Sequence, residues 1–370
     1  MAANPFVYSR PVEPEELIDR EAEAARLVEL AEGGHHSRLS APRRYGKTSL
    51  LGKVRVDAEG IGMTSVYVNF YGILSAEDAI QRIERGYRGL RGPLTNWLAG
   101  VLRTLRPKAS LPGTGVSIEP TLDIPTGQQL TALLDLPVRM FKRTGQRVLV
   151  IYDEFQTVLQ ARPQLDGVMR SVIEQHTKEA SYVFAGSHPG MMHTLFEDRE
   201  RPFYGQARPV PLTPLRDDDL ADYVGRRFSE TGRKVDEALD LLLDLAAGHP
   251  QRAMLIAHYL WEHTAPRETA DETTFAAAIE AVHDEVADQL TSLWGGFDDS
   301  ERRVIAAVAA NPAGPLRKET IEPLGLPRAT GRDALARLER AGHLLTDGEV
   351  IRFTDPLLGR WVENGRQGLI

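Results

Sequence analysis

Three consecutive residues, Gly46, Lys47 and Thr48, are of the types that hold a polyphosphate where a loop leads into a helix. A glycine lets the backbone close around a phosphate, the lysine amine reaches phosphate oxygens, and the threonine hydroxyl can ligate Mg²⁺. Backbone N–H groups and the N-terminus of the next helix complete an anion site of this kind. The pattern therefore predicts a phosphate-binding loop that opens a helix near Ser49.

The rest of this loop begins at Ala41, and every position in it is a candidate contact for the bound phosphates. Besides the three residues above, these positions are Ala41, Pro42, Arg43, Arg44, Tyr45 and Ser49. Ala41 stands where such loops usually have their first glycine, so the backbone there must keep a negative φ to accommodate the Cβ atom. A basic surface turn without a ligand is the alternative interpretation.

A second motif argues for the phosphate site: an apolar segment, residues 147–154, that ends in Asp153 and Glu154. Such a run is typical of a buried parallel strand, and open α/β sheets bind ligands at the carboxyl ends of their strands. We expect Asp153 to hold Mg²⁺ together with Thr48, and Glu154 to act as general base toward an attacking water. The alternative is a core strand that runs into an acidic loop.

Two further segments supply candidates for contacting the terminal phosphate. Ser187 ends the apolar segment 181–187, where a side chain that senses a γ-phosphate would sit; an ordinary strand-end serine is the alternative. Pro250 follows Gly248 at the expected start of a helix. Arg252 then lies one turn into that helix, where its guanidinium can close over the phosphates. An exposed helix arginine is the alternative.

The elements that must position these residues follow from the pattern of apolar segments and turns. We expect an α/β fold, with a P-loop NTPase core around a parallel sheet over residues 1–215, a helical lid over 216–296 and a winged-helix domain over 297–370. Within the core, residues 126–144 are expected to form one helix and residues 109–124 an inserted hairpin. The winged helix is expected to contain helices at 301–310, 318–324 and 330–341, followed by a hairpin at 344–353.

The third of these C-terminal helices is the candidate for contacting a nucleic acid or a protein partner. Its arginines are sufficient to contact a phosphate backbone: Arg328, Arg332, Arg337 and Arg340. Acids of the same domain, such as Asp333 and Glu339, almost balance this charge. The composition therefore suits a protein-facing surface at least as well as a DNA-binding one, and DNA remains an alternative that is not favoured.

Composition restricts the class of protein further. With 370 residues the chain is long enough for two or three domains. It contains no cysteine, which excludes disulfides and thiolate metal sites. Its formal net charge of −8 argues against wholesale coating of nucleic acid. Neither a signal-peptide pattern nor an apolar run long enough to cross a bilayer is present, so we expect a cytoplasmic protein without a membrane partner.

The motifs together resemble those of archaeal-type P-loop ATPases of the STAND and AAA+ group, and the resemblance extends over nearly the whole chain. The segments that carry it are Asn4–Phe6, Pro11–Val12, Asp19–Glu21, Pro42–Leu51, Tyr152–Glu154, Phe353–Leu358 and Trp361. The resemblance implies that the N-terminal segment lies against the adenine and that the turn Gly248–Pro250 closes over the nucleotide. It also implies that ATP, ADP and Mg²⁺ are the ligands and that the winged helix responds to nucleotide state.

One stretch departs from the family pattern. Members often have Tyr-Gly-Arg after the sensor strand, whereas this chain has Tyr204, Gly205 and Gln206. If that arginine completes catalysis in relatives, we expect slow hydrolysis here unless Arg208 takes its place.

Three functions are consistent with these residues. The first is an ATP-hydrolysing switch for signalling, defence or regulated assembly, with Arg208, Arg252 and Ser187 as candidates for sensing the γ-phosphate and with a second copy or another protein as partner. The second is a DNA-binding ATPase of the replication-initiator or transposition-regulator type. The third is a nucleotide-binding scaffold that does not hydrolyse ATP, which Ala41 and Gln206 would favour.

Overall fold

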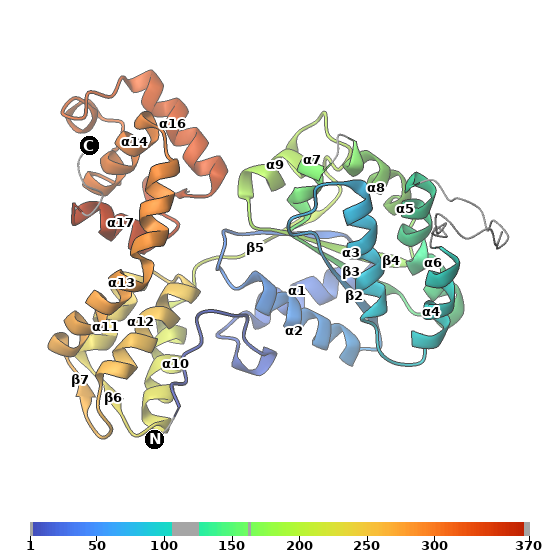
Figure 1. Cartoon of the computed structure of the whole chain (residues 1–370), viewed down its shortest axis with the longest axis horizontal. Helices are drawn as coiled ribbons and strands as arrows, with labels where there is room; N and C mark the ends of the chain where they lie inside the picture. Colours follow the sequence, from blue (N-terminus) through green and yellow to red (C-terminus); the bar gives the residue numbers. More distant parts are fainter. Residues whose placement is uncertain (1–2, 106–125, 162–163, 366–370) are drawn as a thin grey trace, which may run out of the picture.

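The computed structural model describes residues 3–105, 126–161 and 164–365. The hairpin expected at 109–124 lies outside the described residues. The first part of the chain folds into an α/β unit around one sheet (Figure 1). Its strands are β1 (Ser37–Ser40), β2 (Thr64–Asn69), β3 (Val148–Asp153), β4 (Ala180–Gly186) and β5 (Arg208–Pro211). Its main helices are α1 (Glu21–Glu32), α2 (Lys47–Gly60), α3 (Ala76–Arg88), α4 (Thr95–Thr104), α5 (Thr126–Leu134), α6 (Leu136–Thr144), α7 (Val158–Ala161), α8 (Leu165–Ile173) and α9 (Pro189–Glu197).

The strands lie in the order β2-β3-β4-β1-β5, and all pairings between neighbours are parallel. The phosphate-binding loop therefore leaves β1 beside the end of β4, and the acidic motif ends β3 on the other side of β4. Because all strands run in the same direction, both motifs emerge at one edge of the sheet. The parallel α/β core expected from the sequence is confirmed.

Successive side chains of a strand point to opposite faces of the sheet, and different helices cover the two faces. On β3, Leu149 and Ile151 pack with α1 and α2, whereas Val150 and Tyr152 pack with α3, α5 and α8 on the opposite face. Every residue of β3 is buried. A central strand covered on both faces by helices has to be apolar throughout, which explains the continuous run in the sequence.

The helix expected at 126–144 is interrupted. The structure has α5 up to Leu134 and α6 from Leu136, with Pro137 in the first turn of α6. Proline lacks the N–H group that a continuous helix would need at this position, and its ring clashes with the preceding turn. The expectation of a single helix was therefore wrong.

The second part of the chain is a bundle of helices beside the sheet unit (Figure 1). Its helices are α10 (Asp217–Glu230), α11 (Glu237–Ala246), α12 (Pro250–His263) and α13 (Glu272–Gly296), with a short parallel pair of β6 (Lys234–Val235) and β7 (Thr269–Ala270). Phe6, from the N-terminal segment, is buried in this bundle against Phe228. The start of the N-terminal segment is thus fixed to the bundle.

The third part follows the long helix α13. It contains α14 (Asp299–Ala310), α15 (Lys318–Ile321), α16 (Arg328–Ala341), a hairpin of β8 (Leu344–Asp347) and β9 (Val350–Phe353), and α17 (Pro356–Glu363). These are the three helices and the hairpin that the sequence predicts, followed by one more helix. Its apolar core is continuous with that of the bundle. Among the described residues, no helix combines the length and the apolar character needed to cross a bilayer.

Candidate active site

The loop between β1 and α2 has the backbone that a phosphate cradle needs. Gly46 is the N-cap of α2 and has φ of 81°, in the left-handed region that glycine adopts without strain. A Cβ atom there would meet no neighbour within 4 Å, so the backbone conformation, not space, requires the glycine. Ala41 keeps a negative φ, as its Cβ atom demands, and is buried. The first position of the loop therefore accommodates alanine.

Lys47 is buried beneath this loop. Its Nζ donates to the backbone carbonyl oxygens of Ala41, at 2.7 Å, and of Pro42, at 2.6 Å. Burial lowers the pKa of Lys47 to about 8, while the negative charges of Glu154 and Asp153 act in the opposite direction. The lysine and the two acids, which lie more than 100 residues apart in the sequence, therefore share one electrostatic environment.

Asp153 is buried at the end of β3. Its Oδ2 accepts a hydrogen bond of 2.6 Å from the Tyr67 hydroxyl, and its Oδ1 accepts one of 2.9 Å from the Glu154 backbone N–H. Burial raises the pKa of Asp153, and the hydrogen bond from Tyr67 works against this rise. Tyr67, on β2, thus holds the carboxylate in place, a partner that the sequence did not identify.

Glu154 is held by two neighbours at the same sheet edge. Its Oε2 accepts hydrogen bonds from the Ser187 hydroxyl, at 2.6 Å, and from Gln156 Nε2, at 2.7 Å. Ser187 follows β4 directly, so the parallel pairing of β3 with β4 explains the contact. Gln156 is buried, and its Oε1 has no hydrogen-bond partner among the described residues. Sequence reasoning missed Gln156, although its place two residues after the acid was a usable signal.

A cavity of about 570 Å³ joins these residues to the helical bundle. The sheet unit contributes the loop residues 43–49 with Tyr71, Glu154 and Ser187, and the bundle contributes Tyr223, Pro250, Arg252 and Gln289 among others. Residues 7–12 of the N-terminal segment line a third side. That segment is anchored to α2 because the Val12 N–H donates to the Ser49 hydroxyl at 3.1 Å. The volume falls in the range of small-molecule and cofactor sites.

Arg252 lines this cavity but is not the exposed helix residue of the alternative interpretation. It is 1% exposed and forms a two-pronged ion pair with Asp355, in which Nε donates to Oδ1 at 2.9 Å and Nη2 donates to Oδ2. Its Nη1 is buried without a hydrogen-bond partner among the described residues. Burial alone would raise the pKa of Asp355, but the pair with Arg252 keeps it lowered. Asp355 caps α17, so this pair ties the cavity to the C-terminal unit.

His249 supports the same corner of the cavity. It precedes Pro250, accepts a hydrogen bond from the Arg252 N–H at 3.2 Å, and packs its ring edge-on against Tyr45 of the loop, with centroids 5.0 Å apart. Burial lowers the pKa of His249 to about 4. The neutral imidazole can therefore accept this bond at neutral pH. On the adjacent side, Arg44 donates to Gln289 of α13 at 2.8 Å.

The C-terminal unit also touches the sheet unit close to Ser187. A Cβ atom on Gly190, in the first turn of α9, would lie 2.3 Å from the carbonyl oxygen of Arg340 in α16. A Cβ atom on Gly342, which ends α16, would lie 3.1 Å from the Pro189 ring, a tight but less severe approach. Only a glycine at 190 permits this approach of the two backbones. The C-terminal end of α16 thus packs against Gly190, which follows Ser187 by three residues in the sequence.

Of the expected residues, Ala41, Pro42 and Asp153 lie beside Lys47 without lining the cavity, whereas Arg208 is not brought to this region at all. It begins β5, where it pairs with Ser37 at the start of β1, and it is exposed. The loop follows the opposite end of β1, so the length of the strand separates Arg208 from Lys47. The expectation that Arg208 acts on the γ-phosphate of its own chain does not fit this position, and we withdraw it.

Arg43, in the phosphate-binding loop, approaches His188, with Nη2 at 3.4 Å from Nε2.

Comparison with known proteins gives a match in fold. No family model and no curated protein matches the sequence. Among solved structures, a Walker-type ATPase of Pyrococcus abyssi has a TM-score of 0.69 and 18% identity, over 96% of this chain and 99% of that one. The ORC2 protein of Aeropyrum pernix, in ADPNP and ADP complexes, has a TM-score of 0.62 and 15% identity, over 96% of each chain.

A third similar structure is the Aeropyrum pernix ORC1 protein in complex with DNA, with a TM-score of 0.50 and 16% identity, over 94% of this chain and 92% of that one. Identities of this size carry information about fold alone. The sheet order, the helices on both faces and these similarities together show that the chain has the α/β fold of P-loop NTPases.

Proposed function

We propose that this chain is an ATP-binding and ATP-hydrolysing switch of the STAND and AAA+ type, in which nucleotide state sets the position of the helical lid and of the C-terminal winged helix. The observation that carries the proposal is the convergence of Lys47, Glu154, Ser187 and Arg252 on one cavity. Each residue comes from a different element, and each is of the type that polyphosphate chemistry requires.

The cavity suits a nucleoside triphosphate in charge and in shape. The loop N–H groups and Lys47 favour the β and γ phosphates, and the same cavity is lined by Arg252, whose Nη1 has no hydrogen-bond partner among the described residues. Residues 7–12 and Tyr223 offer a surface for the base. Because Lys47 Nζ now satisfies carbonyl oxygens of the loop, phosphate oxygens would compete for it directly.

Thr48 and Asp153 are the residues that would hold Mg²⁺. The described residues contain no group of three or more metal-ligating side chains, so phosphate oxygens and water would have to complete the coordination. When bound, the ion neutralises charge on the phosphate oxygens.

In hydrolysis, Glu154 orients a water toward the γ-phosphorus and accepts its proton as the new P–O bond forms and the bond to the leaving ADP oxygen breaks. Ser187 and Gln156 position the Glu154 carboxylate by donating to the same oxygen, Oε2, which leaves Oε1 for the water. Arg252 lies where it can stabilise the charge of the transferred phosphoryl group.

The switch follows from the partner of Arg252. In this structure Asp355 of the C-terminal unit occupies two of its donor nitrogens. A γ-phosphate that attracts Arg252 competes with Asp355, whereas ADP has no such group. ATP therefore favours the C-terminal unit released from Arg252, whereas ADP leaves it paired through Asp355. Such a difference in binding free energy between two conformations is the requirement for a ligand-driven switch.

Steady-state phosphate release tests the enzymatic part. The native chain should release phosphate from ATP, and Glu154→Gln should reduce the rate about 100-fold or more while ATP binding persists. Glu174→Gln, at the exposed end of α8, is the matched control and should keep the native rate. Equal background rates in the native chain and in Glu154→Gln would leave only the scaffold function, which Ala41 and Gln206 favoured.

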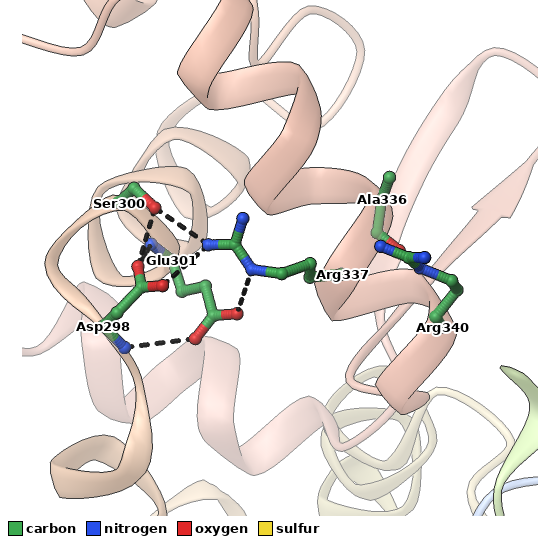
Figure 2. A network of polar contacts seen from close by, with 6 residues as sticks. All are labelled: Asp298, Ser300, Glu301, Ala336, Arg337 and Arg340. Carbon is green, nitrogen blue, oxygen red and sulfur yellow. Dashed lines mark hydrogen bonds and ion pairs between the residues drawn. The ribbon is translucent and has the colours of Figure 1, made fainter. Parts of the chain in front are cut away.

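A DNA-binding ATPase of the replication-initiator type is the second candidate, favoured by the similarity to the ORC1 protein in complex with DNA. In Figure 2, Arg337 points from α16 into the start of α14, where it pairs with Asp298 and Glu301 and donates to Ser300. Its guanidinium is therefore engaged within the unit. Arg328, Arg332 and Arg340 are exposed and form no ion pair among the described residues, but Arg340 Nε donates to the Ala336 carbonyl oxygen at 3.1 Å. Arg328 and Arg332 are therefore the arginines that DNA would contact first.

Salt-dependent binding of duplex DNA tests this second candidate. Reversing both charges, Arg328→Glu with Arg332→Glu, should abolish duplex binding if α16 contacts the phosphate backbone. Arg26→Glu with Arg360→Glu, at two exposed positions of α1 and α17, is the control, because it changes the net charge by the same amount. A duplex affinity that is the same in both variants would reject α16 as a DNA-binding helix.

A further inference from the structure

A second cavity lies at the edge of the sheet that β2 forms, between α2 and α3. Its volume is about 660 Å³, and it is separate from the cavity described above. Four arginines line it: Arg55 of α2, Arg82 and Arg85 of α3, and Arg91 from the loop that follows. Glu59 is the one carboxylate in the lining. The cavity is therefore strongly positive within a chain whose net charge is −8.

The arginines of this cavity are not neutralised by the protein. Within the described residues, Arg55, Arg85 and Arg91 form no ion pair with a carboxylate, and the buried Nε of Arg55 has no hydrogen-bond partner. Arg82 donates to the carbonyl oxygen of Tyr71, at 2.9 Å, and to no carboxylate in the described part of the chain. Glu59 is engaged as well, because the Ser65 hydroxyl donates to it at 2.5 Å. Guanidinium groups left unpaired around one concavity indicate a binding site for an anion.

The walls of this cavity are fixed in the fold. A Cβ atom on Gly86 of α3 would lie 2.7 Å from the carbonyl oxygen of Tyr67, so α3 lies directly against β2. On the other wall the guanidinium carbon of Arg55 lies 5.7 Å from the centre of the Tyr67 ring. The cation–π contact with Tyr67 and the hydrogen bond to Tyr71 position Arg55 and Arg82 before a ligand arrives, which lowers the entropic cost of binding, whereas Arg85 and Arg91 are exposed on the same wall.

We propose that this cavity is a second ligand site, for a small molecule that carries several phosphate groups. Planar guanidinium forks match phosphate oxygens in geometry, and four of them exceed what a single carboxylate ligand would engage. Thr64, Asn69 and Leu90 add polar and apolar contacts for the remainder of such a molecule. The cavity is a half-open recess of limited volume, of a size that suits a small molecule, and binding of a nucleic-acid strand is an outcome that the test below distinguishes.

Two contacts connect this site with the nucleotide cavity. The ring of Tyr67 faces Arg55, and its hydroxyl donates to Asp153 at 2.6 Å. Arg82 donates to the backbone of Tyr71, and Tyr71 lines the nucleotide cavity. A ligand that draws Arg55 toward itself changes the packing of Tyr67, which holds Asp153. A ligand that draws Arg82 changes the hydrogen bond that holds Tyr71. This coupling rests on the proposed function, whereas binding at the second site does not.

Inorganic tripolyphosphate is a suitable probe, and calorimetric titration of the full chain is the measurement. Lys47→Ala serves as background so that the phosphate loop does not bind the probe. The probe should bind this variant, and the added changes Arg85→Gln and Arg91→Gln should weaken binding about tenfold or more. Arg88→Gln is the matched control, because Arg88 lies on the same helix outside the cavity and pairs with Glu84. It should leave the affinity unchanged.

Two outcomes would overturn the site: absence of tripolyphosphate binding to the Lys47→Ala chain, or equal weakening by the control and the cavity variants. Binding of a single-stranded oligonucleotide in preference to tripolyphosphate would also reject a small-molecule ligand. The coupling has its own readout at fixed free Mg²⁺. Tripolyphosphate competes with ADP for the phosphate loop in every chain that keeps Lys47, so the coupling is the part of its effect on ADP affinity that Arg85→Gln with Arg91→Gln removes. Tyr67→Phe should remove the same part while it keeps tripolyphosphate binding. An unchanged response in Tyr67→Phe would refute the coupling alone.

Discussion

Replacing Asp355 with asparagine should make the chain more selective for ATP over ADP. The carboxylate of Asp355 occupies Nε and Nη2 of Arg252 at the wall of the nucleotide cavity. Asparagine has nearly the same shape and keeps an acceptor for the Leu357 N–H that caps α17, but it removes the charge. Arg252 then becomes available to a γ-phosphate at a lower cost.

The magnitude follows from the bond that is weakened. Hydrogen bonds to charged groups contribute about 1.5 to 3 kcal/mol each. Arg252 is 1% exposed and the side chain of Asp355 is 21% exposed, so solvent screens the pair weakly. If the γ-phosphate must displace one such bond, Asp355→Asn should tighten binding of a non-hydrolysable ATP analogue by about tenfold to 150-fold. ADP affinity should change by less than about threefold, because ADP lacks the competing phosphate.

Calorimetric titration of both nucleotides measures the ratio of affinities. Glu301→Gln is the matched control: it weakens an ion pair with Arg337 in the same C-terminal unit, at 3.0 Å, far from the cavity. Its affinity ratio should equal that of the native chain.

An unchanged ratio in Asp355→Asn would refute competition between Asp355 and the γ-phosphate. If Asp355→Asn proves too unstable to titrate, Arg252→Gln tests the same reasoning, since it should weaken the ATP analogue and spare ADP. Equal loss of both nucleotides in Arg252→Gln would contradict the assignment of Arg252.

Three further predictions concern the loop and the catalytic carboxylate. Burial lowers the pKa of Lys47 to about 8 in the free chain, and phosphate binding favours its ammonium form. ADP affinity should therefore be flat below about pH 7 and should fall by up to about tenfold per pH unit above pH 8. Gly46→Ala should destabilise the chain by about 1 to 2 kcal/mol in denaturant unfolding because of its positive φ. Gly52→Ala, in the same helix, should stabilise it by about 0.5 to 1 kcal/mol. Ser187→Ala should slow phosphate release about tenfold to 100-fold with nucleotide affinity retained, whereas Ser181→Ala, at the other end of β4, should not.

Each of these has a clear contradicting result. ADP affinity independent of pH between 7 and 10 would mean that Lys47 does not contact phosphate. Equal unfolding free energies for the two glycine variants would mean that the loop does not need its positive φ. Equal rates in the two serine variants would remove Ser187 from the site.

The sequence predicted those parts of the fold that depend on local pattern. The apolar run of β3 indicated a strand buried on both faces because such a strand has no polar side to present. Gly46 and Lys47 indicated a loop because the conformation and the chemistry are carried by adjacent residues. The break at Pro137 was missed because the apolar period continues across it, although proline cannot continue a helix.

Contacts between distant segments were predictable only where topology fixes them. Ser187 and Glu154 end neighbouring parallel strands, so their contact follows from strand order. Arg208 was misplaced because the sequence does not show that it begins β5, at the end of the sheet opposite to the phosphate-binding loop. Asp355 as the partner of Arg252 was not predicted, because 103 residues separate them and no pattern links them. Such pairs depend on how the helical bundle packs on the C-terminal unit.

The most direct test of the account is equilibrium binding of Mg²⁺ and ATP to the purified chain and to Lys47→Ala. We expect one saturable site in the native chain and a loss of affinity of at least about 100-fold in the variant, because Lys47 Nζ contacts the loop carbonyl oxygens where phosphate oxygens would compete for it. A native chain that binds no adenine nucleotide, or equal affinities in the two proteins, would contradict the central claim that a triphosphate lies between Lys47 and Glu154.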